Sequence, residues 1–163
     1  YTLLQNGADK ISVNTSAFRN PGLINVLSAE FGSQCVVLAI DTKKEDDDEW
    51  YVYLNGGREK TTMKCIDWAL QGVDRGAGEI LLTSMNHDGT KEGFSLDITG
   101  LLSKRLPVPV IASGGAGIPQ HFVDVFKKAS ADAALAASIF HFREVGIREL
   151  KIYLDEHGIP VRL

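Results

Sequence analysis

The sequence has few of the features that mark disulfide-bonded, metal-binding or membrane proteins. Its 163 residues include two cysteines, Cys35 and Cys65, which form neither a C-x-x-C motif nor the spacing of metal ligands. We therefore expect free thiols without a function and no metal site. No hydrophobic run approaches the roughly 18 residues of a membrane span, and no secretory signal is recognisable. The default expectation is a cytoplasmic protein without a membrane partner.

Clusters of positive charge are also missing. The chain has 17 Lys and Arg against 21 Asp and Glu, a formal net charge of −4, and no stretch concentrates the basic residues. Because nucleic-acid-binding surfaces need clustered basic side chains, a nucleic-acid partner is not expected. The dinucleotide fingerprint G-x-G-x-x-G does not follow the first hydrophobic runs, and no cofactor is expected.

Short hydrophobic runs alternate with helical stretches along the sequence. Strands are predicted at residues 10–13, 35–40, 80–82, 108–112 and 133–137, and helices at 21–31, 63–75, 96–104, 119–130 and 145–157. Such nearly continuous runs are expected of strands buried on both faces of a parallel sheet. The order predicts an α/β fold of about five βα units.

One connection carries a different pattern. The acidic run 45–49 is followed by Trp50–Leu54, then by Asn55-Gly56 and an extended piece through Thr62. An Asn-Gly pair between β-prone residues is a strong hairpin signal. We expect a small two-stranded ribbon inserted between the second strand and its helix, with the acidic run as a solvated turn.

An internal repeat points to the architecture. Residues 8–18 match residues 131–140 in an Ala-Asp start, a hydrophobic run and a hydroxyl six residues after the Asp, at Thr15 and Ser138. The two copies are far enough apart to hold several strand–helix units, so the repeat relates large pieces of a fold. With the glycine-rich turn late in the chain, this favours a barrel over an open doubly wound sheet. By the repeat, residues 1–6 lie in a helix, and we expect one domain, residues 1–163, forming the C-terminal part of a (β/α)8 barrel.

Phosphate-binding candidates follow the last two predicted strands. Gly114 and Gly115 follow the fourth strand, and Ala137 and Ser138 end the fifth. In barrels these loops commonly bind phosphate, since glycines let backbone N–H groups approach the oxygens. A plain turn is the alternative for the glycine pair, but the small residue and hydroxyl one unit later favour the functional interpretation.

The repeat supplies a second candidate site at Asn14 and Thr15, for which a helix cap or Asx-turn is the alternative. Two sites at one barrel mouth suit an elongated ligand with a phosphate at each end. Asp41 closes the second hydrophobic run, where barrels place proton-transfer groups, with a loop-capping role as an almost equal alternative. Thr83 ends the third run, and the turn at 88–89 could present its backbone to the phosphate.

Six segments carry a resemblance to a known family and span nearly the whole chain: residues 8–15, 37–41, 76–84, 88–91, 111–117 and 133–142. They resemble the cyclase subunit of imidazole glycerol phosphate synthase. Leu-Leu-Thr-Ser followed by Asp-Gly-Thr-Lys is specific to that family. The resemblance implies roughly the last five units of the barrel. It also implies a lyase of histidine biosynthesis that converts a bisphosphorylated ribulosyl aminoimidazole carboxamide intermediate and ammonia into imidazole glycerol phosphate.

The resemblance also implies roles for individual residues and a partner. Asp41 matches a catalytic general acid or base, and Thr83 an auxiliary hydroxyl. The residues that match one phosphate site are Asp88, Gly89, Gly115, Ala137 and Ser138. Asn14 and Thr15 match part of the other, and Lys10 and Glu79 match half of a charged gate. Through that gate ammonia enters from a glutaminase subunit.

The partial barrel leads to three further expectations. The family's other catalytic Asp lies on the first barrel strand, upstream of this sequence, so we expect the chain alone to have little or no cyclase activity. Exposed strand edges in a partial barrel favour self-association. Residues 84–91 and 140–144 favour the cyclase over the sister isomerase of the pathway, and a non-catalytic phosphate-binding barrel remains an alternative of another class.

Overall fold

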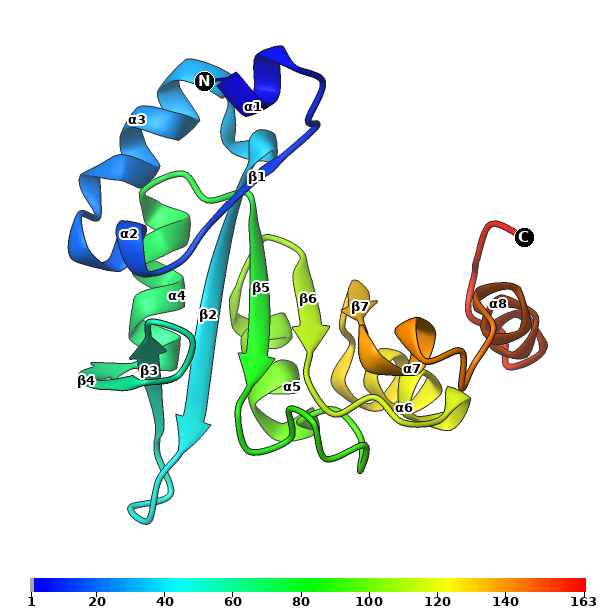
Figure 1. The fold of residues 1–163 in the computed structure, drawn as a ribbon. Helices are drawn as coiled ribbons and strands as arrows, with labels where there is room; N and C mark the ends of the chain where they lie inside the picture. The colour runs from blue at the N-terminus through cyan, green and yellow to red at the C-terminus, as the bar shows by residue number, and fades with distance from the viewer. Residues whose placement is uncertain (1) are drawn as a thin grey trace.

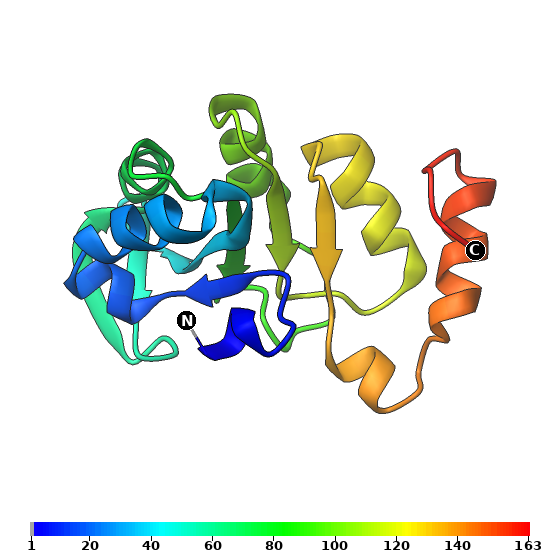
Figure 2. The same ribbon diagram turned by 90° about the horizontal axis from the view of Figure 1, so that it is seen from above.

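The computed structural model describes residues 2–163 and shows a curved, open sheet with helices along one side (Figures 1 and 2). The chain starts in helix α1 (Thr2–Gln5), as the repeat predicts for this segment, while Tyr1 lies outside the described residues. Across residues 2–163, none of the helices combines the length and hydrophobicity needed to cross a lipid bilayer.

The parallel part of the sheet confirms the predicted strands. In the described chain these are β1 (Ile11–Val13), β2 (Val36–Lys44), β5 (Glu79–Ser84), β6 (Val110–Ser113) and β7 (Ala133–Leu135). They pair in the order β1-β2-β5-β6-β7, all parallel. Together with the intervening helices they form the βα units of a TIM-type fold, in a sheet that is not closed.

The predicted helices are confirmed with small shifts at their ends. They are α3 (Gly22–Phe31), α4 (Cys65–Asp74), α5 (Leu96–Arg105), α6 (Pro119–Ala129) and α8 (Ile147–Glu156). Three short segments were not predicted: α2 (Thr15–Arg19), the 3-10 turn η1 (Ser33–Cys35) and α7 (Ser138–His141). Each is too short to show a helical hydrophobic period.

The inserted ribbon is present but larger than predicted. Strands β3 (Trp50–Leu54) and β4 (Glu59–Lys64) pair antiparallel, as expected. However, β3 also pairs antiparallel with the last four residues of β2, from Asp41 to Lys44, so the predicted end of β2 was wrong. The acidic run is the turn of this β2–β3 hairpin, closed by the Glu45 N–H donating to Glu49 O at 3.0 Å. Pairing with β3, and at Asp41 and Thr42 also with β5, prolongs β2 beyond its hydrophobic run.

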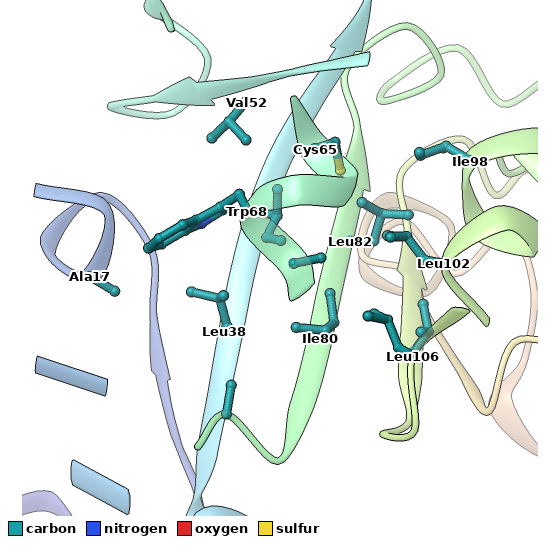
Figure 3. Packing of buried hydrophobic residues seen from close by; sticks show 14 of the residues in the cluster. Ala17, Leu38, Val52, Cys65, Trp68, Ile80, Leu82, Ile98, Leu102 and Leu106 are labelled. Atoms are coloured by element: carbon teal, nitrogen blue, oxygen red, sulfur yellow. The ribbon is translucent and has the colours of Figure 1, made fainter. Parts of the chain in front are cut away.

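Helices cover one face of the central parallel strands β2, β5 and β6. Leu38, Ile80 and Leu82 pack against Trp68 of α4 and Leu102 of α5, all at most 2% exposed (Figure 3). Along β5 the alternate side chains are only half-buried, so the expectation of strands buried on both faces was wrong. The half-buried face is the concave side of the arc in Figure 2, opposite α3, α4, α5 and α6.

A second hydrophobic cluster lies beneath the loops that follow β5, β6 and β7. Phe94, Ala116 and Ile139 belong to it, together with Phe122 on α6 and Leu154 on α8. The rings of Phe94 and Phe122 meet edge to face with centroids 5.3 Å apart. Because these residues adjoin Gly93, Gly115 and Ser138 in the sequence, their burial holds the glycine-containing loops in place.

The sheet ends in free strand edges. Within the described residues β1 pairs with β2 alone and β7 with β6 alone. Unpaired edges offer N–H and C=O groups to another chain. Self-association stays a prediction.

Candidate functional site

A row of polar side chains crosses the sheet near the carboxyl ends of the parallel strands. The register pairs Asp41 with Thr83, Thr83 with Ser113, and Ser113 with Leu135. Residues paired in parallel register point to the same face, which is the half-buried one. Asp41 and Thr83, predicted from separate strand ends, are therefore neighbours.

The surroundings of Asp41 shift the pKa of its carboxyl upward. Partial burial raises the pKa of this carboxyl above its ordinary value, the Asn14 hydrogen bond opposes that shift, and the negative charge of Asp88 adds to it. The Asn14 Nδ2 donates to Asp41 Oδ2 at 3.1 Å. Because Asn14 follows β1 and Asp41 lies within β2, the pairing of these strands brings the two side chains together.

A pocket of about 190 Å³ opens at the carboxyl ends of β6 and β7. It is lined by Asp88, Gly89, Lys91, Ser113, Gly114, Gly115, Ala116, Leu135, Ala136, Ala137 and Ser138. The structure thus brings together every phosphate candidate from the predicted turns after β5, β6 and β7. These residues come from separate loops and meet only through the order of the strands.

Gly114 and Gly115 shape one wall of this pocket. Their φ angles are 89° and 101°, a left-handed region that side chains disfavour. A Cβ on Gly115 would lie 2.0 Å from Gly93 O, while the Gly93 N–H donates to Gly115 O at 2.8 Å. Both glycines are therefore required by backbone geometry, and their role in phosphate binding stays a prediction.

The wall of the pocket opposite these glycines differs from the predicted strand end in one respect. Strand β7 ends at Leu135, so Ala137 and Ser138 do not end the strand: Ala137 is the N-cap of α7 and Ser138 its first residue. First-turn amides of a helix lack partners within it. Among the described residues, none accepts a hydrogen bond from the N–H of Gly114, Gly115 or Ser138. These amides are free to bind a ligand oxygen.

Lys91 was not predicted as a site residue, although it ends the segment 88–91 that also contains Asp88 and Gly89. It lines the pocket, and its ammonium contacts both carboxylate oxygens of Glu144 at 2.6 and 2.7 Å. A basic residue two positions after a turn assigned to phosphate was the signal available. Glu144 could not be predicted from the sequence, because its contact with Lys91 depends on the fold.

The turn that carries Asp88 and Gly89 is fastened to the end of β5. The Asp88 N–H donates to Ser84 O at 2.9 Å, and the buried Ser84 Oγ lies 3.0 Å from His87 Nδ1. This contact between the Ser84 and His87 side chains holds the turn against the pocket.

The second candidate site does not join this pocket. Thr15 is the first residue of α2, and its Oγ1 accepts a hydrogen bond from the Asn55 N–H at 2.9 Å. Asn14 donates to Asp41, so both side chains already have protein partners. The structural repeat is nonetheless clear, because β1 leads into the short helix α2 as β7 leads into α7.

Lys10 and Glu79 form an ion pair at the amino ends of the strands, away from the polar row. Lys10 precedes β1 and Glu79 begins β5, on either side of β2. In residues 2–163, no group of three or more His, Cys, Asp or Glu is arranged to hold a metal ion.

The fold and the site define an α/β protein of the TIM-barrel type with its polar groups at the carboxyl ends of the strands. Comparison with known proteins gives the family. The model of the family described as "Histidine biosynthesis protein" matches residues 1–146, and the chain belongs to this family.

Individual relatives agree with this assignment. The imidazole glycerol phosphate synthase subunit HisF of Clostridium botulinum (strain Okra / Type B1) is 59% identical over 162 residues, which is 99% of this chain and 64% of that protein. The same subunit is 57% identical in Bacillus subtilis (strain 168), over 99% of this chain and 64% of that protein. In Flavobacterium johnsoniae it is 56% identical, over 99% of this chain and 64% of that protein. The resemblance found in the sequence is confirmed, and the chain spans 64% of the length of these relatives.

Proposed function

We propose that the chain contributes to the cyclase subunit of imidazole glycerol phosphate synthase, a lyase of histidine biosynthesis. In this proposal the pocket between β6 and β7 binds one phosphate of the bisphosphorylated ribulosyl intermediate, and Asp41 moves protons at the reacting centre. The observation that carries the proposal is one row of side chains: it runs from Asp41 through Thr83 to Ser113 at the edge of the pocket.

The spacing of the row fits a phosphorylated small molecule. Asp41 and Ser113 lie on strands two positions apart, which corresponds to about 10 Å between them at the usual strand separation. A phosphate held by the amides of Gly114, Gly115 and Ser138 would leave the rest of a sugar-derived chain to extend toward Asp41. The raised pKa of Asp41 brings this carboxyl closer to the range in which it can both take up and release a proton.

Asn14 and Thr83 act on Asp41 in this proposal in different ways. The Asn14 amide donates to the carboxylate and so fixes its orientation and favours its charged form. Thr83 lies beside it in register and offers a hydroxyl to the same part of the ligand. We also assign Asn14 and Thr15 to part of the site for the second phosphate.

Ammonia would come from a glutaminase subunit at the opposite end of the strands. The relatives are named as subunits of a synthase, which supports a partner for this chain. The Lys10–Glu79 ion pair lies at that end and would form part of the entry gate.

A cyclase assay of the chain, alone and with the N-terminal segment of the Bacillus subtilis relative added in trans, tests the proposal. We expect little turnover of the chain alone and ammonia-dependent formation of imidazole glycerol phosphate on addition. The substitution Asp41→Asn should lower that rate by about 10²-fold or more and leave phosphate binding intact. Aldose–ketose isomerisation in place of cyclisation would support the sister isomerase.

The pocket itself also fits a non-catalytic phosphate-binding role, and one measurement separates the two. Titration with inorganic phosphate should perturb the amide resonances of Gly114, Gly115 and Ser138 in either case. Binding without turnover in the complemented assay would favour the non-catalytic role, and turnover by the Asp41→Asn variant would contradict the assignment of the carboxylate.

A further inference from the structure

The pocket between β6 and β7 has an unfavourable balance of charge for an anion. Its lining carries one negative side chain, Asp88, and Lys91 is the one cationic side chain among the described residues that line it. Glu144 neutralises Lys91 by contacting its ammonium with both carboxylate oxygens. With this ion pair in place, the local sum of charges is negative, and a phosphate dianion would meet only uncharged donors, namely backbone amides and the hydroxyls of Ser113 and Ser138.

Lys91 is held close to the glycine loop by its backbone. Its φ angle is 61°, and a Cβ on Gly117 would lie 2.3 Å from Lys91 O. The loops 84–93 and 113–117 are therefore in close contact, which keeps the Lys91 stem at the rim of the pocket. Because the four-carbon side chain of Lys91 is flexible, its ammonium can bind different acceptors within its reach.

Glu144 lies outside the pocket lining but is joined to the wall opposite the glycine loop. Its N–H donates to Ile139 O at 2.8 Å, which ties it to α7, the helix that begins with the pocket residue Ser138. The ion pair consequently spans from the loop after β5 to the loop after α7. The side chains of Lys91 and Glu144 are 44% and 38% exposed, so water screens the pair and makes it easy to exchange.

We propose that Lys91 is a phosphate ligand of this pocket and that Glu144 competes with the phosphate for its ammonium. Without phosphate, Glu144 holds the ammonium at the rim. A phosphate group carries more negative charge than a carboxylate, and it can also accept hydrogen bonds from the free backbone amides of Gly114 and Gly115. Lys91 then moves from Glu144 to the phosphate. This inference rests on the proposed function, since it concerns the same phosphate site.

The two halves of the inference predict opposite effects for two charge-neutralising substitutions. Lys91→Met should weaken binding of inorganic phosphate by about tenfold, since a charge-assisted hydrogen bond is lost. Glu144→Gln should strengthen it by about two- to fivefold, because the competing carboxylate is gone. A merely supporting role for Glu144, in which it positions Lys91, predicts weaker binding for both.

The chain offers a matched control in the Lys64–Glu49 ion pair of the ribbon, with a distance of 2.8 Å and exposures of 46% and 48%. Lys64→Met and Glu49→Gln make the same changes in net charge away from the pocket. Calorimetric titration with inorganic phosphate at low salt, with thermal unfolding of each variant to verify folding, should leave the affinity of both controls within twofold of the wild-type chain.

The outcomes distinguish this inference from the proposed function. If the wild-type chain binds phosphate and Lys91→Met binds it equally well, or Glu144→Gln binds it no better, the competition is refuted while the site stands. If the wild-type chain shows no phosphate binding, the proposed function loses its phosphate site and the inference falls with it. Stronger binding confined to Glu144→Gln, absent from Glu49→Gln, supports the competition.

Discussion

The substitution Gly115→Ala tests whether the glycine loop is as tightly constrained as its geometry indicates. Gly115 has a φ of 101° and lies so close to Gly93 that an added Cβ would be 2.0 Å from the carbonyl oxygen. Gly89 lines the same pocket at a φ of 78°, but a Cβ there would meet nothing within 4 Å. Gly89→Ala is therefore a control that shares the backbone strain but not the collision.

The expected loss of stability follows from separate contributions. A left-handed conformation destabilises a residue with a side chain by about 1–2 kcal/mol. Replacing glycine by alanine also lowers the conformational entropy of the unfolded chain, which offsets about 0.4–1 kcal/mol of this loss. That leaves about 1 kcal/mol for Gly89→Ala. For Gly115→Ala the Gly93 carbonyl must move away, and loss of the Gly93–Gly115 hydrogen bond adds about 1 kcal/mol. With the displacement of the packed loop, we expect about 3 kcal/mol for Gly115→Ala.

Urea unfolding followed by circular dichroism measures both variants. With a slope of about 2 kcal/mol per molar, the difference of about 2 kcal/mol corresponds to a midpoint about 1 M lower for Gly115→Ala than for Gly89→Ala. Equal midpoints for the two variants would refute the close approach. A changed slope would instead indicate altered compactness, and the comparison would then use stabilities at the same urea concentration.

Three further expectations concern titration and assembly. Asn14→Ala should raise the pKa of Asp41, because the carboxylate loses a hydrogen-bond donor, whereas Asp88→Asn should lower it by removing a negative neighbour; carboxyl NMR titrations that show the opposite signs would contradict the described environment. Burial raises the pKa of the Cys65 thiol from 9.0 to about 12. The folded chain therefore keeps a proton that the unfolded chain releases: stability is unaffected below pH 9 and falls by about 1.4 kcal/mol per unit from there toward pH 12. The difference in stability between the wild-type chain and Cys65→Ala should stay constant from pH 8 to 9 and then change with this slope up to pH 10.5, and a constant difference throughout would count against it. Sedimentation should show self-association through the free strand edges, and a monodisperse monomer would rule it out.

The sequence determined the elements of the fold because hydrophobic spacing reports local structure directly. The five parallel strands and the longer helices follow from runs and periods that any fold must bury. Gly114 and Gly115 were identifiable for a similar reason, since a left-handed turn selects glycine whatever surrounds it. The repeat of Thr15 and Ser138 corresponds to two short helices that begin at these residues, although each helix was too short to predict.

Contacts between distant segments were decided by the tertiary structure. Asp41 pairs with both β3 and β5, and the last two residues of β2 pair with β3 alone, so no pattern within residues 36–44 could show that Asp41 lies inside the strand. The pKa of Asp41 depends on burial and on the hydrogen bond from Asn14, and Lys91 is paired with Glu144 across two loops. A sequence thus specifies which side chains are present and which local conformation they favour. The pKa of a side chain and the partners that it binds depend on neighbouring residues, and only the packing of the folded chain brings these neighbours together.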